Sequence, residues 1–355
     1  MWPFQTARME AREFARIVVR VPNPLGDQIM ATAALDALRK RFPSAHIAGH
    51  GSATAKQLYA GMDCFDEFLV SGRRESVWTQ AALLRRGRFD LSVLLAGSFR
   101  SALPPFLARI RHRAGYRWSG RSLLLTARWP RPKPGGKAQP YPTKQFYLDL
   151  VGKLGATGAG RSRLVVTGDE EARAALWMKR EGLGEPLLSM CVGAAFGPSK
   201  MWPAESFAAV GDAMAERFGA RVVLLCAPGE REVALRVKRA MKAPLPDTWT
   251  DPLDVGMLKA VIARSRALLT NDTGPRHIAA CLNVPVVCLM GPTSPVYTEA
   301  DTEGQVVLRR EDVACSPCHL PVCPIDHRCM TWIKPKDALE AVERVWVRGE
   351  SLQDS

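Results

Sequence analysis

The sequence ALLTNDTGPRHIAACL at residues 267–282 passes from a short apolar strand into a helix through one polar turn. We expect the strand at 267–270 and the helix at 275–282, with Asp272 or Thr273 available to cap the helix. Parallel α/β sheets are built from this unit, because a helix must connect each strand to the next. The stretch therefore predicts a parallel α/β fold around it.

The same alternation extends through the rest of the second half. Apolar runs of four to seven residues predict strands, and the amphipathic runs between them predict helices. The remaining strands are expected at 187–192, 221–226 and 284–290, and the remaining helices at 204–217, 230–241 and 253–264.

The first half repeats the pattern, with a strand at 17–21, a turn at 22–27, a helix at 28–41 and a second strand at 91–95. A chain of 355 residues is too long for one ordinary core and suits two domains. We therefore predict an α/β fold of two Rossmann-like domains whose parallel sheets face a central cleft. The expected domains are 1–165 and 166–345, followed by a tail at 346–355.

Positive charge is concentrated in the first half. Residues 1–160 hold 25 Lys and Arg against 10 Asp and Glu, a surplus of +15, whereas residues 161–355 hold 24 against 25, a balance of −1. A basic field confined to one half indicates an anionic partner such as nucleic acid, an acidic membrane face or a phosphorylated substrate. A basic surface that only aids solubility is the alternative.

The sequence contains no run of about 18 apolar residues that would predict a membrane span. Its first 16 residues carry five charges and no apolar stretch, which is unlike a secretory signal, so we expect a cytoplasmic protein. Five of the nine cysteines are scattered, mostly in apolar runs, and are interpreted as reduced core residues.

Asp27 is the first candidate for chemistry. It follows the strand at 17–21 and stands beside Gly26, which permits close approach of a ligand. A carboxylate in this place can act as a general base. The same residue occupies the expected N-cap of the helix at 28–41, and on local evidence alone the cap is favoured.

The turn at 271–277 is the second candidate. The N–H groups and dipole of its helix would hold a diphosphate, Gly274 would let the ligand approach, and His277 could reach it. Lys200 lies in a loop between a strand and a helix, where it could contact the same phosphates. A well-capped core helix and a solvated loop lysine are the alternatives.

Glu230 follows another expected strand and could accept hydrogen bonds from ribose hydroxyls. The chain contains no Asp-x-Asp pair, which many metal-dependent sugar-nucleotide enzymes use to hold a divalent cation on the diphosphate. Lysine and a helix N-terminus would then stabilise the leaving charge.

Four cysteines lie close together near the C-terminus, at Cys315, Cys318, Cys323 and Cys329. With His319 and His327 nearby, they are compatible with a zinc or iron–sulfur site. Their spacing is not that of paired Cys-x-x-Cys knuckles, and a disulfide or a reduced structural loop is the favoured interpretation. Direct catalysis by these thiols is the least favoured.

Taken together, these motifs resemble glycosyltransferase family 9, the ADP-heptose:lipopolysaccharide heptosyltransferases, and within it the heptosyltransferase II branch. The resemblance covers nearly the whole chain. It rests on the motifs at 24–27, 97–103, 115–117, 196–203, 271–277 and 291–295, which agree in order and spacing.

The resemblance implies a GT-B fold with an N-terminal acceptor domain and a C-terminal donor domain. It implies inverting, metal-independent transfer of heptose from ADP-heptose to the heptose/Kdo inner core of lipopolysaccharide, with no required cofactor. By motif position Asp27 corresponds to the catalytic base. The donor site would comprise Gly26, Lys200, Glu230, Asp272, Thr273, Gly274 and His277.

Asn23, Arg100 and Arg117 are the candidates for acceptor contacts. Two departures from the family pattern concern the substrates. Pro22-Asn23-Pro24 replaces a serine-rich turn, and Ala194-Ala195-Phe196 lacks the paired threonines that some relatives place near the donor.

The implied partners are ADP-heptose and the lipid A–core oligosaccharide. The basic half would face the acceptor at the cytosolic face of the inner membrane, as a peripheral protein. A family 9 transferase with another sugar nucleotide or acceptor is the nearest alternative. A nucleic-acid-binding protein with a metal-bound Cys cluster is a more distant one, because no recognised DNA or RNA motif accompanies the basic residues.

Overall fold

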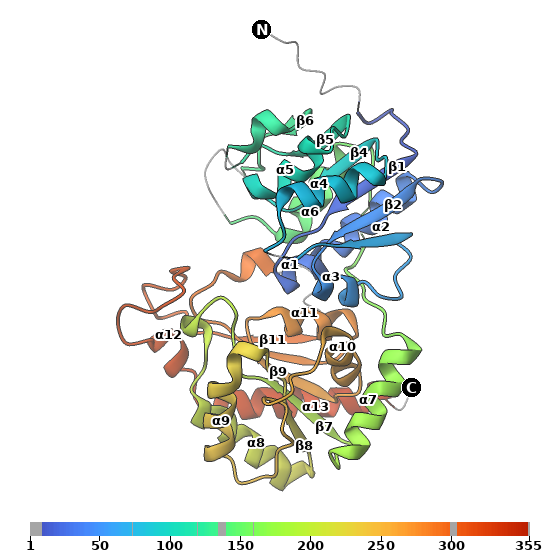
Figure 1. Ribbon diagram of the computed structural model, residues 1–355. Helices are drawn as coiled ribbons and strands as arrows, with labels where there is room; N and C mark the ends of the chain where they lie inside the picture. The colour runs from blue at the N-terminus through green and yellow to red at the C-terminus, as the bar shows by residue number, and fades with distance from the viewer. Residues whose placement is uncertain are drawn as a thin grey trace. The chain divides into compact units, whose positions relative to one another are not determined.

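The computed structural model describes residues 9–72, 74–118, 120–133, 140–158, 160–298 and 304–353. The chain forms two compact units, each built on its own parallel sheet (Figure 1). Among the described residues, unit 1 comprises those up to 164 together with 296–298, and unit 2 comprises the others. The chain thus returns to unit 1 at the 3-10 turn η6 (Pro295–Thr298), which the sequence analysis assigned to the second domain.

Unit 1 contains a six-stranded parallel sheet with the order β3-β2-β1-β4-β5-β6. Its strands are β1 (Arg16–Arg20), β2 (His46–Gly51), β3 (Glu67–Val70), β4 (Leu91–Leu94), β5 (His112–Tyr116) and β6 (Ala127–Trp129). The register places Val19 of β1 beside Gly49 of β2 and Val93 of β4. The strand order reverses between β1 and β4, so their carboxyl ends form a topological switch point, where α/β sheets bind ligands.

The helices of unit 1 are α1 (Leu25–Met30), α2 (Thr32–Arg41), α3 (Ala53–Leu58), α4 (Val77–Arg86), α5 (Phe99–Leu107), the 3-10 helix η2 (Arg121–Leu124) and α6 (Thr143–Gly152). The expectation that Asp27 is an N-cap is wrong. α1 begins at Leu25, because the Pro24 carbonyl already accepts a hydrogen bond from the Gln28 N–H at 3.0 Å. Asp27 therefore lies in the first turn of the helix.

Unit 2 contains a five-stranded parallel sheet with the order β11-β10-β9-β7-β8. Its strands are β7 (Leu187–Cys191), β8 (Arg221–Leu224), β9 (Ala267–Asn271), β10 (Val286–Leu289) and β11 (Gln305–Leu308). Its helices are α7 (Gly168–Arg180), α8 (Ala204–Phe218), α9 (Arg231–Ala240), α10 (Val255–Ala263), α11 (Gly274–Cys281), α12 (Arg328–Thr331) and α13 (Pro335–Gln353), with 3-10 turns η4 (Pro198–Lys200) and η5 (Pro228–Glu230). Strands β7, β9 and β10 are buried along their whole length, as expected for a sheet covered on both faces.

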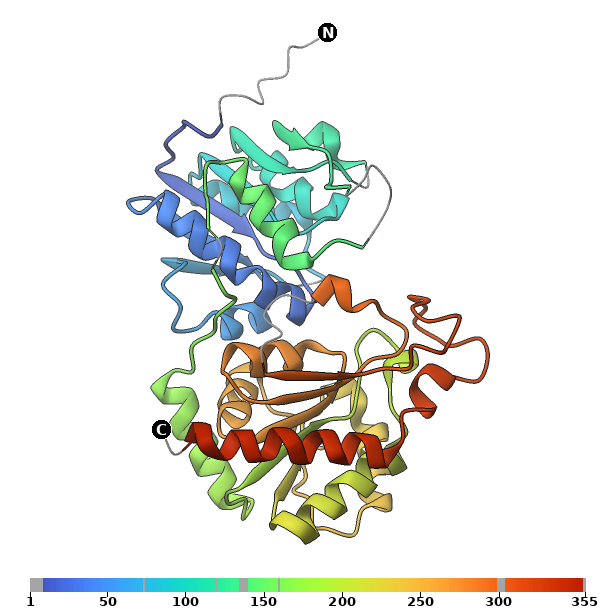
Figure 2. The same ribbon diagram turned by 180° about the vertical axis from the view of Figure 1, so that it is seen from behind.

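The helix α13 replaces the expected tail at 346–355. It lies along the sheet of unit 2, where it contacts β9, β10 and α8 (Figure 2). Trp346 is buried in the core of the unit, so apolar burial continues the helix past the point where a tail was predicted. Residues 354–355 of the predicted tail lie outside the described part of the chain.

No helix within the described ranges is both long enough and apolar enough to cross a membrane.

Candidate functional site

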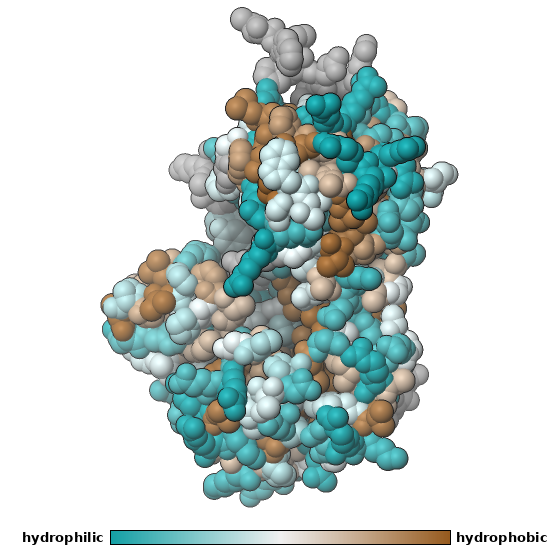
Figure 3. Space-filling model, viewed as in Figure 1, coloured by the Kyte–Doolittle hydropathy of each residue, from teal (hydrophilic) through white to brown (hydrophobic). Residues whose placement is uncertain are grey.

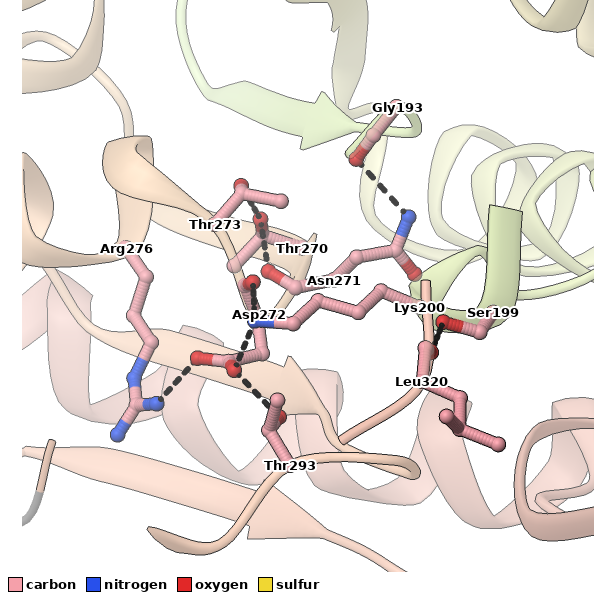
Figure 4. A network of polar contacts seen from close by, with 10 residues as sticks. All are labelled: Gly193, Ser199, Lys200, Thr270, Asn271, Asp272, Thr273, Arg276, Thr293 and Leu320. Carbon is pink, nitrogen blue, oxygen red and sulfur yellow. Dashed lines mark hydrogen bonds and ion pairs between the residues drawn. The ribbon is translucent and has the colours of Figure 1, made fainter. Parts of the chain in front are cut away.

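Asp272 lies at the centre of a buried polar network at the carboxyl end of β9 (Figure 4). Lys200 Nζ is 2.6 Å from its Oδ2 atom, and Arg276 Nη1 is 3.0 Å from its Oδ1 atom. The Thr293 hydroxyl donates to Oδ2 at 2.7 Å. Two cations therefore surround one carboxylate, and the group carries an excess of positive charge.

Asp272 is ionised in this environment. Burial alone would favour the neutral acid, but the positive charges of Lys200 and Arg276 outweigh it and hold the pKa of Asp272 well below its usual value. The carboxylate thus holds the lysine ammonium in place.

The expectation that Asp272 or Thr273 caps α11 is wrong, because neither side chain makes a capping hydrogen bond. The Thr273 hydroxyl instead lies 3.4 Å from that of Thr270. Pro275 has no N–H group, and the Arg276 N–H donates to the Thr273 carbonyl at 3.3 Å. The Gly274 N–H and the helix dipole are therefore what the start of α11 offers to an anion. His277 follows in the same helix and is buried.

Asn271 joins the Lys200 loop to two strand ends. Its Oδ1 atom accepts from the Trp202 N–H at 3.0 Å, and its Nδ2 atom donates to the Val192 and Gly193 carbonyls at 2.9 and 3.2 Å. Sequence reasoning gave no role to Asn271, Arg276 or Thr293. The first two stand inside the motif at 271–277, but nothing in the pattern shows that their side chains turn inward.

Glu230 lies at the end of η5, after β8. Its Oε2 atom accepts from the Ala227 N–H at 2.8 Å, and burial raises the pKa of the carboxyl. The carboxylate packs directly on Gly193, where an added Cβ would lie 1.9 Å from Glu230 Cδ. Only glycine leaves room for Glu230 at this strand end.

These residues gather at one edge of the unit 2 sheet. Gly193 follows β7, Glu230 follows β8 and Asp272 follows β9, and the three strands are neighbours. The strand order reverses between β7 and β9, so the network of Asp272 and Lys200 lies at a topological switch point. An electropositive strand end with a carboxylate two strands away suits a ligand that carries phosphates and hydroxyls.

Asp27 belongs to the other unit. It is half-buried in the first turn of α1, and the Tyr147 hydroxyl of α6 donates to its Oδ2 atom at 3.4 Å. Burial raises the pKa of Tyr147 well above its usual value, and the Asp27 charge raises it further, so the phenol remains a donor. Gly26 precedes Asp27 in the same turn.

The acceptor candidates lie after neighbouring strands of the unit 1 sheet. Asn23 follows β1, Arg100 follows β4 and Arg117 follows β5, and all three are exposed. Arg100 Nη2 donates to the Glu75 carbonyl at 2.8 Å. Asn23 is held through its carbonyl, which accepts from Gln28 Nε2 at 2.9 Å.

The four clustered cysteines are unpaired and line one small cavity. Burial raises the pKa of Cys329 to about 11, and the neighbouring thiols of Cys318, Cys323 and Cys315 contribute to the rise. Across the residues that the structure describes, no three His, Cys, Asp or Glu side chains are arranged to hold a metal ion, so a structural metal gains no support. The reduced loop fits this geometry.

Residues 77–328 match the sequence model of glycosyltransferase family 9 (heptosyltransferase). The chain is similar to lipopolysaccharide heptosyltransferase 2 of Salmonella typhimurium, with 30% identity over 317 residues that cover 83% of this chain and 88% of that protein. It is also similar to lipooligosaccharide heptosyltransferase 2 of Haemophilus influenzae, with 26% identity over 305 residues, or 82% and 88% of the two chains.

Among solved structures, the chain is similar to the ADP-heptose lipopolysaccharide heptosyltransferase II of Escherichia coli. The TM-score is 0.78 and the identity 26%, over 94% of this chain and 99% of that one. A family 9 glycosyltransferase from Veillonella parvula shares the fold, with a TM-score of 0.81 at 23% identity over 97% and 100% of the two chains.

Proposed function

The chain belongs to glycosyltransferase family 9, and from that premise we propose that it transfers heptose from ADP-heptose to the inner core of lipopolysaccharide. Relatives that align over more than four-fifths of the chain carry the name heptosyltransferase 2. The observation that carries the proposal for the donor is the buried pairing of Lys200 with Asp272 beside the start of α11. With Arg276, which bonds to the same carboxylate, the group carries the net positive charge that a departing nucleoside diphosphate requires.

The donor contacts follow from this pairing. Lys200 and the Gly274 N–H at the start of α11 bind the diphosphate, and Glu230 accepts hydrogen bonds from the ribose hydroxyls. The Lys200 ammonium has three N–H groups, of which two bond to Asp272 at Oδ2 and at the carbonyl oxygen. The third is available to a phosphate oxygen. Thr273, Gly274 and His277 complete the donor contacts.

The reaction is a single in-line displacement with inversion. Asp27 takes the proton from an acceptor hydroxyl, whose oxygen forms a bond to the anomeric carbon as the bond from that carbon to ADP breaks. The position of Asp27 supports this role, because it lies half-buried in the first turn of α1, where the Tyr147 hydroxyl donates to its carboxylate. No metal ion takes part, since Lys200 and the helix dipole supply the compensating charge.

We further propose that unit 1 contacts the anionic face of the membrane that holds the acceptor. Unit 1 exposes four large apolar side chains close together in the chain. Phe99 and Phe106 lie on α5, Trp118 lies between β5 and η2, and Leu123 lies on η2. Residues 74–133 hold 13 Lys and Arg against 2 Asp and Glu. The face of unit 1 that is turned to the viewer in Figure 3 carries hydrophobic patches beside hydrophilic ones.

Two of these exposed aromatic side chains form cation–π pairs with arginines of the same unit. The Arg131 guanidinium lies 4.2 Å from the centre of the Trp118 ring, and that of Arg113 lies 5.4 Å from Phe106. Aromatic side chains beside arginines suit the interface of a bilayer with anionic headgroups.

Sedimentation with vesicles tests this contact. The double variant Trp118→Ser with Leu123→Ser should lose most binding to vesicles of phosphatidylglycerol. Leu176→Ser, which alters an exposed leucine of unit 2, should keep it. The proposal requires weak binding to uncharged phosphatidylcholine vesicles. Equal binding by the double variant and the control would contradict it.

Release of ADP tests the transfer itself. Purified protein should release ADP from ADP-heptose only when a heptosylated core acceptor is present, and UDP- and GDP-sugars should give little product. Preference for another nucleotide would identify a different donor within the family. A gel-shift with random duplex DNA at physiological salt separates the enzyme from a nucleic-acid-binding protein, and for the enzyme we expect no shift.

A further inference from the structure

Ser199 precedes Lys200, and its polar groups bond to the cysteine-rich segment, defined as residues 315–329. Its N–H donates to the Pro321 carbonyl at 3.1 Å, and its hydroxyl donates to the Leu320 carbonyl at 2.6 Å. Its own carbonyl accepts from His327 Nε2 at 2.6 Å. The N–H, hydroxyl and carbonyl of a buried residue thus all depend on one distant segment.

Close packing adds to these hydrogen bonds. Gly197 has a φ of +146°, and a Cβ on it would lie 2.3 Å from the Pro321 carbonyl oxygen. The backbone of the cysteine-rich segment therefore lies directly against the Lys200 loop. No side chain larger than hydrogen fits between them.

The N-terminal part of the cysteine-rich segment forms hydrogen bonds with the loop after β10. The Ser316 hydroxyl donates to the Gly291 carbonyl at 2.7 Å, and the His319 N–H donates to the Pro292 carbonyl at 2.8 Å. Thr293, which donates to Asp272, follows at once. The segment therefore supports both loops whose side chains reach the Asp272 carboxylate.

We propose that the cysteine-rich segment is a brace that positions Lys200, and that His327 is its positioning residue. The inference rests on the proposed role of Lys200 as a diphosphate contact and goes beyond it, because it assigns a function to a segment outside the donor motifs. A carbonyl oxygen can only accept a hydrogen bond, so His327 Nε2 carries the proton. This bond fixes the peptide that leads into Lys200.

The four thiols fit the same function. They line a cavity that Ser199, Pro292 and His327 also line, so they adjoin both loops that the segment supports. Of the four, Cys329 is buried and acts as a small apolar side chain packed on Gly291, whereas Cys315 is exposed. A bulky group attached to Cys329 would press on the loop after β10.

The test is a double-mutant cycle on ADP affinity and donor KM. His327→Ala should raise both the Kd for ADP and the KM for ADP-heptose about tenfold, with the acceptor KM unchanged, because one hydrogen bond is lost. His327→Gln keeps a donor nitrogen and should restore most of the affinity. Val322→Ala alters an exposed side chain of the same segment that does not line the cavity, and it should have no effect.

The decisive arm is His327→Ala in a Lys200→Ala background. If His327 acts through Lys200, its effect on ADP affinity should disappear there. An undiminished effect would overturn the brace, and so would an unchanged donor KM in the single variant. Full affinity in Lys200→Ala alone would instead refute the proposed role of Lys200. If His327→Ala does not fold, Ser199→Ala, which removes only the hydroxyl bond, takes its place in the cycle.

Discussion

Lys200 Nζ lies 2.6 Å from Asp272 Oδ2, and the exposed fractions of the two side chains are only 13% and 6%. The lysine charge is thus balanced before any ligand arrives, and its position is set by a residue 72 positions away in the sequence. A phosphate that binds there meets an ammonium already stripped of most of its water. Pre-organisation of this kind makes an electrostatic contact effective in a transition state.

Asp272→Asn should destabilise unit 2 by about 3 kcal/mol, because it leaves the buried cations Lys200 and Arg276 without their shared counter-charge. Urea denaturation followed by circular dichroism would measure the loss. Asp312→Asn, which alters an exposed pair with Arg310, is the control and should change little.

The depressed pKa of Asp272 determines how the stability lost in Asp272→Asn depends on pH. Because the pKa of Asp272 is depressed in the folded protein, its contribution is complete above the unfolded value near 4 and declines as the pH falls through the folded value. The difference between Asp272→Asn and the original chain should therefore stay constant between pH 6 and pH 8. A difference that shrank across this window would contradict the ion-pair account.

Asp27→Ala should lower kcat by about 10²- to 10⁴-fold, the usual contribution of a general base, and leave ADP affinity unchanged. Steady-state ADP release and calorimetric titration with ADP would separate the two effects. Glu13→Gln, at an exposed carboxylate of the same unit, is the control. Near-normal turnover of Asp27→Ala would show that another group takes the proton.

Tyr147→Phe should move the acid limb of the pH–rate profile to higher pH. The tyrosine hydroxyl donates to Asp27 Oδ2 and so favours the ionised carboxylate that accepts the proton. Without it the carboxylate is protonated more easily, and kcat at neutral pH should fall by about fivefold. A uniform fall in rate without a shift of the limb would mean that Tyr147 only packs against α1.

The sequence predicted the alternation of strands and helices, since apolar runs of this kind are set by local burial. It misplaced the start of α1 because Pro24 and Gly26 read as a turn. In fact Pro24 supplies the last extended residue before the helix, and Gly26 is tolerated in the first turn. Local pattern cannot distinguish these arrangements, because tertiary contacts select between them.

The residues of the candidate site were predictable from the sequence, but most contacts between them were not. Lys200 and Asp272 were both expected near a diphosphate, but their mutual ion pair was not, because it joins loops that follow different strands. The sequence did not predict the bonds of Arg276 and Thr293 to Asp272, for the same reason. Their roles depend on which side chains point inward at a strand end, and sequence spacing does not determine that.

Gly193→Ala should raise the donor KM to the level of Glu230→Ala while the melting temperature changes little. The new methyl would lie 1.9 Å from Glu230 Cδ, but the end of a glutamate side chain can rotate away at small cost to stability. The displaced carboxylate would no longer meet the ribose. Gly219→Ala is unsuitable as a control because Gly219 has a positive φ, so Gly184→Ala, which meets no neighbour, should be used.

Transfer should persist after dialysis against EDTA. A metal-dependent site would need carboxylates free to coordinate the cation, but the Asp272 carboxylate is already bonded to Lys200, Arg276 and Thr293. A divalent cation would have to displace two buried positive charges, which the excess of positive charge around Asp272 opposes. Activity measured with EDTA, and again after Mg²⁺ is restored, should agree within experimental error. A loss in EDTA that Mg²⁺ reverses would require a different account of how the charge on ADP is stabilised.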